Sequence, residues 1–471
     1  MKSCWLIFIL ALLGHSVSEA QYITEVMEYT PAPGQLINTI PWGTPAGAKS
    51  IERSVEGSLS LGAFGGYVIF RFEDPVENDP SNPFGVDFTI FGNPIVEWAE
   101  PGVVWVMKDE NENGEADDTW YELAGSDYLF NSTLRGQRVT YYNPGGDEAQ
   151  DISWEDILGN SGWIRTNTAH FQPYYPLHDS FPSIPQENYQ LTGSQIEGLV
   201  FEHPSGMKSI ERAFGYADNH LRGSAPYTLP DNPYTREVEN SGGDAFDIGW
   251  AVDSAGHYVE LDRIQFIKVQ CGILDDGGIL GELSTEITGA LDIPPDPSVT
   301  GETEMVVISD LPPLLEAGEY QLEVFIYHNG RIRNDGSVYW TTSGSGATVD
   351  DHQMLKVTEE GPLTVTATLS DRPEISASVS TLVQLNQTGG LLRDMSGDKR
   401  LPYPNPFTDN FKVRGTLNSS LIVYDASGKA LIRVNRNREE TTVDMSGYPA
   451  GTYLVRIERD DSVEWYKMIK R

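Results

Sequence analysis

The sequence predicts an all-β protein, and three observations support this prediction. The chain of 471 residues contains 46 glycines and 29 prolines, which favour turns and interrupt helices. Short runs rich in Val, Ile, Thr and aromatic residues recur along it, among them GGYVIFRFE, VDFTIFG, YQLEVFIYH and TYLVRIE. Nothing longer than a turn or two has helical periodicity. At this length we expect several β domains.

The N-terminus has the pattern of a secretory signal peptide. Lys2 precedes an apolar run from Cys4 to Leu13, and a small-x-small cleavage sequence ends at Ala20. The run is too short to cross a hydrocarbon core of roughly 30 Å as a helix. We therefore expect residues 1–20 to be removed and the mature chain to begin at Gln21.

Removal of the signal peptide leaves Cys271 as the last thiol, so an intramolecular disulfide is excluded. In the run RIQFIKVQC this cysteine alternates with Val269 and Ile267. Residues two apart in a strand share a face. We therefore expect Cys271 to be a buried strand residue.

Acidic residues dominate the chain, whose formal net charge is −37. Residues 1–20 sum to zero and residues 401–471 to +2, so residues 21–400 carry −39. Such a field repels nucleic acid and anionic lipid and attracts divalent cations. We expect no nucleic-acid partner.

A calcium loop is the sharpest local motif, in the sequence KDENENGEADDTWYE at 108–122. It reads D-x-N-x-N-G-x-x-D, and alternate side chains of a tight loop can direct oxygens at one Ca²⁺ ion, which takes six to eight oxygen ligands. No helices flank it, and the twelfth position is Trp120, so it departs from an EF-hand. An Asx-rich turn without metal is the alternative. The expected ligands are Asp109, Asn111, Asn113, Glu115 through its carbonyl, Asp117, and Asp118 or Glu122.

A second group of acidic and amide residues lies in GYADNHLRG and GGDAFDIGWAVDSAG. Its spacing is not diagnostic, and ordinary turn chemistry is the alternative. It is a second possible metal or ligand cluster, formed by Asp218, Asn219, Asp244 and Asp247.

The region from about residue 50 to 290 contains the segments FGVDFTIFGNP, EPGVVWVMKDENENGEADDTWYELAGS and FGYADN. It resembles PKD-like "cell surface protein" family members of Bacteroidetes. The resemblance implies a jelly-roll-like β-sandwich over residues 21–294, exposed at the surface, with no known catalytic residues. Members of that family often accompany outer-membrane uptake receptors.

Residues 295–385 follow a proline-rich linker, DIPPDPSVTG. The strand EMVVISDL, the hairpin-like EYQLEVFIYHNGRIRNDGSVYW and the closing TVTAT and SAS segments resemble a bacterial immunoglobulin-like module. This resemblance implies an Ig-like β-sandwich with Trp340 in its core. Residues 386–400 are polar and are expected to form a second linker.

Residues 401–471 contain YPNPF, VYDASGK, DMSGYPAGTYLVRI and a terminal KMIKR. They resemble the type A C-terminal sorting domain of the Bacteroidetes type IX secretion system, a small β-sandwich. The resemblance implies export to the cell surface through the secretion machinery. It also implies removal of the domain by a sortase-like peptidase, with attachment to surface lipopolysaccharide or release.

Function is predicted to be ligand binding rather than catalysis, because the common motifs of hydrolases, metalloproteases and nucleotide-binding enzymes are missing. Flat rings with a polar tip suit sugars and corrinoids. We expect a calcium-stabilised protein that binds a glycan or a nutrient such as a cobalamin-type ligand. A secreted polysaccharide hydrolase and an adhesive or structural surface protein are the alternatives. The candidate ligand platforms are Trp98, Trp163, Tyr174 and Tyr175, with loop anchors as their alternative reading.

Overall fold

The computed structural model forms two compact units, Met1–Leu385 and Asn386–Arg471. Within them it describes residues 21–471 except 204–205, 226, 228, 236–237, 239–242, 300, 345, 385–406, 415–418, 426–429, 437–439, 450, 460–461 and 471. The predicted cleavage site at Ala20 and the predicted linker at 386–400 lie outside the described residues. In the part that is described, no helix is long and apolar enough to cross a membrane.

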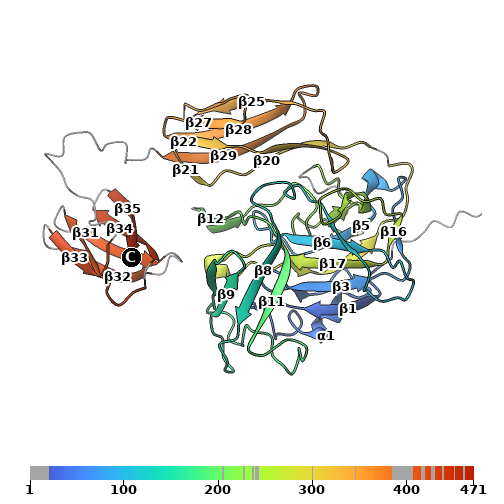
Figure 1. The fold of residues 1–471 in the computed structure, drawn as a ribbon, viewed down its shortest axis with the longest axis horizontal. Helices are drawn as coiled ribbons and strands as arrows, with labels where there is room; N and C mark the ends of the chain where they lie inside the picture. Colours follow the sequence, from blue (N-terminus) through green and yellow to red (C-terminus); the bar gives the residue numbers. More distant parts are fainter. Residues whose placement is uncertain are drawn as a thin grey trace, which may run out of the picture. The chain divides into compact units, whose positions relative to one another are not determined.

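A six-stranded antiparallel sheet forms the centre of the first unit (Figure 1). Its strands are, in spatial order, β1 (Glu25–Thr30), β3 (Tyr67–Arg71), β17 (Phe266–Cys271), β6 (Gly102–Met107), β7 (Trp120–Leu123) and β15 (Ala251–Val252). The central strands are nearly continuous runs of buried residues, because other elements cover both of their faces. Cys271 is fully buried at the end of β17, as the alternation of the sequence predicts.

A four-stranded sheet lies beside it in the order β10 (Ser161–Ile164), β9 (Ile152–Asp156), β8 (Leu134–Tyr142) and β11 (Asn188–Gln195). Along β8 and β11 the side chains alternate between buried and exposed, so this sheet has one packed face and one solvent face. The remaining strands of the first 294 residues are β14 (Asp244–Phe246), β5 (Phe88–Phe91) and β19 (Gly289–Asp292) in one sheet, and the pairs β12 (Val200–His203) with β13 (Gly206–Ser209), β16 (Arg263–Ile264) with β4 (Val76–Glu77), and β18 (Glu286–Ile287) with β2 (Leu59–Ser60).

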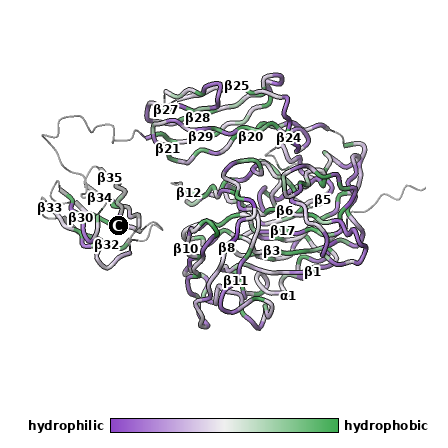
Figure 2. The backbone as a smooth tube through the Cα atoms, in the orientation of Figure 1, coloured by the Kyte–Doolittle hydropathy of each residue, from purple (hydrophilic) through white to green (hydrophobic). Residues whose placement is uncertain are grey.

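Helices are short and few among the described residues: α1 (Pro45–Ala48), η1 (Lys49–Ile51), η2 (Pro83–Gly85), η3 (Ile248–Trp250) and η4 (Gly278–Leu280). The Thr44 hydroxyl caps α1 by accepting a hydrogen bond from the Gly47 amide at 3.0 Å. Figure 2 shows hydrophobic residues along the strands and hydrophilic residues along many of the connecting loops. The all-β prediction is confirmed.

Residues 301–384 form three further sheets within the first unit. These are β20 (Glu304–Ile308), β23 (Val324–His328) and β24 (Arg331–Ile332); β21 (Leu314–Glu316), β29 (Ser376–Gln384), β28 (Gly361–Leu369) and β25 (Val338–Ser343); and β22 (Gly318–Gln321), β27 (Met354–Val357) and β26 (Thr348–Val349). Trp340 packs against both hydrophobic clusters of this region. The indole of Trp250 donates to the Asn329 carbonyl at 3.0 Å, so this region packs directly on the preceding one.

The second unit is also built from antiparallel strands. The strands are β30 (Asn410–Arg414) paired with β33 (Glu440–Asp444), and a sheet of β32 (Ala430–Arg436), β31 (Ser419–Asp425), β34 (Gly451–Arg459) and β35 (Ser462–Lys470). Phe411, Val423 and Val455 are among the buried residues that join the two sheets in one core. The result is a small β-sandwich.

Candidate functional site

The predicted calcium loop connects β6 to β7, and its oxygen-bearing side chains turn inward. The Asp109 carboxylate accepts hydrogen bonds from the amides of Asn113, at 3.1 Å, and Gly114, at 2.8 Å. The side-chain amides of Asn111 and Asn113 both approach the Asp117 carboxylate at 3.2 Å. Gly114 has a φ of +77°, which glycine adopts without strain. The loop is thus held together by hydrogen bonds from its own backbone and side-chain amides to its Asp and Asn side chains.

Of the other expected ligands, Asp118 and Glu115 lie in the loop and Glu122 lies in the adjoining strand. Asp118 belongs to the loop, since its carboxylate accepts a hydrogen bond from the Glu110 amide at 2.9 Å. Glu122 does not, because it is buried in β7 and accepts a hydrogen bond from the Ser194 hydroxyl at 2.5 Å. Strand pairing of Glu122 with Trp105 and Val252 holds it in the sheet. Glu115 is exposed, and its amide donates to Asn113 at 2.7 Å.

The second predicted cluster separates into parts in the structure. Asp244 accepts hydrogen bonds from the amides of Asn219, at 2.9 Å, and His220, at 3.0 Å, so Asp244 and Asn219 do meet. Asp218 is fully buried and its carboxylate turns to other partners, the amides of Asn93 and Glu286, each at 2.8 Å. Asp247 begins η3, where its carboxylate accepts from the Gly249 amide at 2.6 Å.

Asp218 belongs to a group of three carboxylates that sequence reasoning missed. One ligand oxygen each of Glu100, Asp218 and Glu286 lie within 4.8 Å of one another. Burial raises the pKa of Glu100 to about 7. The pKa values of Asp218 and Glu286 are also raised well above their ordinary values, first by burial and then by the neighbouring carboxylates. These residues are far apart in sequence, so no spacing signals the group.

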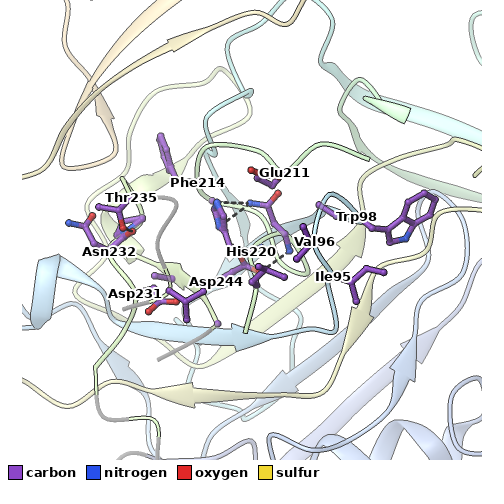
Figure 3. Close-up of a pocket in the computed structure, with 18 of the residues that line it drawn as sticks. Ile95, Val96, Trp98, Glu211, Phe214, His220, Asp231, Asn232, Thr235 and Asp244 are labelled. Atoms are coloured by element: carbon purple, nitrogen blue, oxygen red, sulfur yellow. Dashed lines mark hydrogen bonds and ion pairs between the residues drawn. The ribbon is translucent and has the colours of Figure 1, made fainter. Parts of the chain in front are cut away.

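A cavity of about 170 Å³ adjoins Asp244 (Figure 3). His220 Nδ1 lies 3.0 Å from Asp244 Oδ1 in its wall. The described residues that line the cavity are mostly acidic, amide or aliphatic: Ile95, Val96, Glu97, Trp98, Ala99, Glu211, Phe214, Gly215, Asn219, His220, Leu221, Asp231, Asn232, Pro233, Thr235, Val238, Gly243, Asp244 and Ala245. Chemically, such a wall offers hydrogen-bond acceptors and one imidazole, which suits a polar, uncharged or cationic ligand.

The four candidate platforms have different environments. Tyr174 and Tyr175 are buried in a hydrophobic cluster, so they are anchors of their loop and not exposed platforms. Trp98 is partly buried, and in Figure 3 its ring points away from His220 and Asp244. Trp163 is 50% exposed. Of the four, Trp163 alone has the exposure that a stacking surface needs.

Trp163 belongs to a row of side chains across the outer face of the four-stranded sheet. Strand pairing aligns Trp163 with Ser153, Ser153 with Tyr142, and Tyr142 with Asn188. Two positions along each strand, on the same face of the sheet, the next row aligns Ser161, Glu155, Thr140 and Gln190. Tyr142 is 36% exposed, and its hydroxyl donates to the Glu155 carboxylate at 3.1 Å. Tyr142 and Trp163 share this row, with Ser153 between them, because of the strand register, which the sequence does not reveal.

Comparison with known proteins gives one family match. Residues 402–471 match the secretion system C-terminal sorting domain family. No curated protein matches the chain. Among solved structures, the titin Ig tandem domains A164-A165 are 16% identical, with a TM-score of 0.14, over 36% of this chain and 98% of that one.

Two further solved structures are also similar at a low level. The S-layer protein rSbsC(31-844) is 9% identical, with a TM-score of 0.18, over 87% of this chain and 53% of that one. Dimeric latent PorU from Porphyromonas gingivalis is 11% identical, with a TM-score of 0.13, over 72% of this chain and 30% of that one. These TM-scores do not establish a common fold. The sorting-domain match does establish how the chain is handled: it is a cargo of the type IX secretion system, exported to the cell surface or the extracellular space.

Proposed function

We propose that this exported protein binds a glycan on the outer face of the sheet formed by β10, β9, β8 and β11. The observation that supports this proposal is the cross-strand row that contains both Trp163 and Tyr142. Neighbouring strands lie about 4.8 Å apart, so two residues separated by one strand lie roughly 9.6 Å apart. That distance is on the scale of two linked sugar rings.

The polar residues around the two rings match the needs of a sugar. Ser153 lies between the rings, and Asn188 continues the row beyond Tyr142. Hydroxyl and amide side chains donate and accept hydrogen bonds without charge. The Arg165 guanidinium lies over the Trp163 ring, 5.6 Å from its centre, a contact that would restrain the indole. A restrained ring loses less entropy when a ligand stacks on it.

The loop between β6 and β7 would bind Ca²⁺ in this proposal. Asp109, Asp117 and Asp118 supply charged oxygens and Asn111 and Asn113 neutral ones, the ligand types that Ca²⁺ prefers. The ion would stabilise the fold and take no part in glycan contact. We further propose that the exported protein is attached to surface lipopolysaccharide and cooperates with an outer-membrane uptake receptor. A cobalamin-type ligand is an alternative to a glycan on the same row of rings.

A secreted hydrolase is the second candidate, because His220 and Asp244 form a hydrogen-bonded pair in a cavity wall. An imidazole oriented by a carboxylate can act as a general base. Hydrolysis would require that pair, whereas binding would require the row of rings. The two functions are therefore separated by different substitutions.

The test is a glycan array probed with the full chain, with Trp163→Ala and with Tyr142→Ala. Tyr339→Ala is the matched control, since Tyr339 is 47% exposed and lies in β25. We expect each platform variant to weaken binding about tenfold, or about 1.4 kcal/mol, and the control to bind normally. Binding to no glycan, or equal binding by all variants, would refute the proposal. Cleavage of array glycans that Asp244→Asn abolishes would favour the hydrolase.

A further inference from the structure

Arg138 is a cation on the outer face of the four-stranded sheet. It lies in β8, two positions before Thr140 and four before Tyr142, and it is exposed, as Tyr142 is. Side chains two residues apart along a strand share a face. Strand pairing places Arg138 opposite Thr192 of β11. Arg138 therefore belongs to a third row of the face on which we propose that the glycan binds.

Arg138 has no carboxylate opposite it, unlike two other cations in strands of the same unit. Arg71 pairs in register with Glu25 and forms an ion pair with it at 2.6 Å. Lys356 pairs with Glu319 and lies 3.5 Å from its carboxylate. Such opposite charges on directly paired residues stabilise a sheet. The residue opposite Arg138 is an uncharged threonine, and none of the described residues forms an ion pair or a hydrogen bond with its guanidinium.

Two other charged groups near the rows of this face have partners within the protein. The Glu155 carboxylate accepts a hydrogen bond from the Tyr142 hydroxyl at 3.1 Å. The Arg165 guanidinium donates to the Asp151 carboxylate at 2.8 Å. The guanidinium of Arg138 can therefore turn to a ligand without breaking a contact with a described residue.

We propose that the glycan bound by this sheet carries an acidic sugar, whose carboxylate is recognised by Arg138. This inference rests on the proposed function and names the class of glycan. A planar guanidinium donates two parallel hydrogen bonds to one carboxylate, a geometry that separates an acidic sugar from its neutral counterpart. Four residues of a strand span roughly 14 Å. The acidic sugar would therefore lie beyond the unit that stacks on Tyr142, further along β8.

The charge of the chain limits the kind of acidic glycan. Residues 21–400 carry −39, a field that repels polyanions. Salt screens this repulsion beyond about 8 Å at physiological ionic strength, whereas a carboxylate in contact with Arg138 lies within that distance. We therefore expect a mostly neutral chain with a single acidic sugar.

The experiment is a glycan array of matched pairs, whose two members are identical except that one sugar is glucuronic acid in the first and glucose in the second. We expect the full chain to bind the acidic member of its preferred pair about tenfold more tightly. Arg138→Gln should bind both members equally, with the affinity of the parent for the neutral one. The matched control is Arg71→Gln, which removes the same charge from β3 and should keep the preference.

The outcomes separate this inference from the proposed function. Equal binding of both members by the parent would overturn the acidic sugar and leave glycan binding intact. So would a preference that Arg138→Gln retains, once thermal unfolding has verified that this variant folds as the parent does. If no glycan binds, or if Trp163→Ala and Tyr142→Ala bind as the parent does, the proposed function fails and this inference fails with it.

Discussion

The Ser194 hydroxyl donates a hydrogen bond of 2.5 Å to the carboxylate of Glu122, inside the first unit. Burial raises the pKa of Glu122 to about 7, although Ser194, Arg135 and Lys268 each act to lower it. The folded protein therefore holds a proton on Glu122 at a pH where the unfolded chain has released it. Glu100, with a pKa raised by burial to about 7, and Glu282, with a pKa raised to about 8, behave in the same way.

Stability is predicted to fall as the pH rises from about 4.5 to above 7. Below the unfolded pKa both states are protonated, and above the folded pKa the folded state carries the full cost of a buried charge. The shift of Glu122 corresponds to about 3 kcal/mol. Glu122→Gln should remove that share of the pH dependence and be more stable than the parent at pH 8. Thermal unfolding in chelator at pH 5 and pH 8 checks this prediction, with a substitution at an exposed residue, Glu148→Gln, as the control. If the stability of the parent and of Glu122→Gln depends on pH in the same way, the prediction is wrong.

Calcium is predicted to raise the melting temperature of the full chain. With a dissociation constant of roughly 10⁻⁴ M and Ca²⁺ at about 100 times that value, the gain is about 2.7 kcal/mol. For a unit of this size that is a shift on the order of a few degrees. Asp109→Ala should remove the part that belongs to the loop, since Asp109 accepts from two of its amides.

The control for this prediction is Asp147→Ala, an exposed aspartate in another turn. Mg²⁺ should substitute poorly, because it demands a smaller octahedral shell and loses its water reluctantly. If Asp109→Ala and the parent show the same calcium shift, the loop is an Asx-rich turn without metal.

Deletion of residues 401–471 is predicted to trap a folded protein in the periplasm. The second compact unit has its own hydrophobic core, so we expect the first unit to fold without it. Cell fractionation and surface proteolysis of the deletion and the parent measure the effect. Normal surface levels of the truncated protein would show that sorting does not use this domain.

Local features were predictable from the sequence because they are made within a few residues. The loop that contains Asp109 and Asp117 is one example, since the hydrogen bonds among its own residues span at most eight positions, although the Asp109 amide also donates to the distant Gln265. Burial of Cys271 is another, because alternation along one strand reveals it. The sorting domain is contiguous, so its motifs identify it without any knowledge of the fold.

Sites built from distant segments were decided by tertiary structure alone. Trp163 and Tyr142 share a row because β10, β9 and β8 pair in one register, and a shift of one residue would place them on opposite faces. Asp247 lies only three residues after Asp244, yet it leaves that group to face the loop that holds Asn82. Tyr174 and Tyr175 resemble exposed platforms in sequence but are buried, because they pack in one hydrophobic cluster with the sheet of β10, β9, β8 and β11. Register and burial depend on the whole core, which no short run of residues determines by itself.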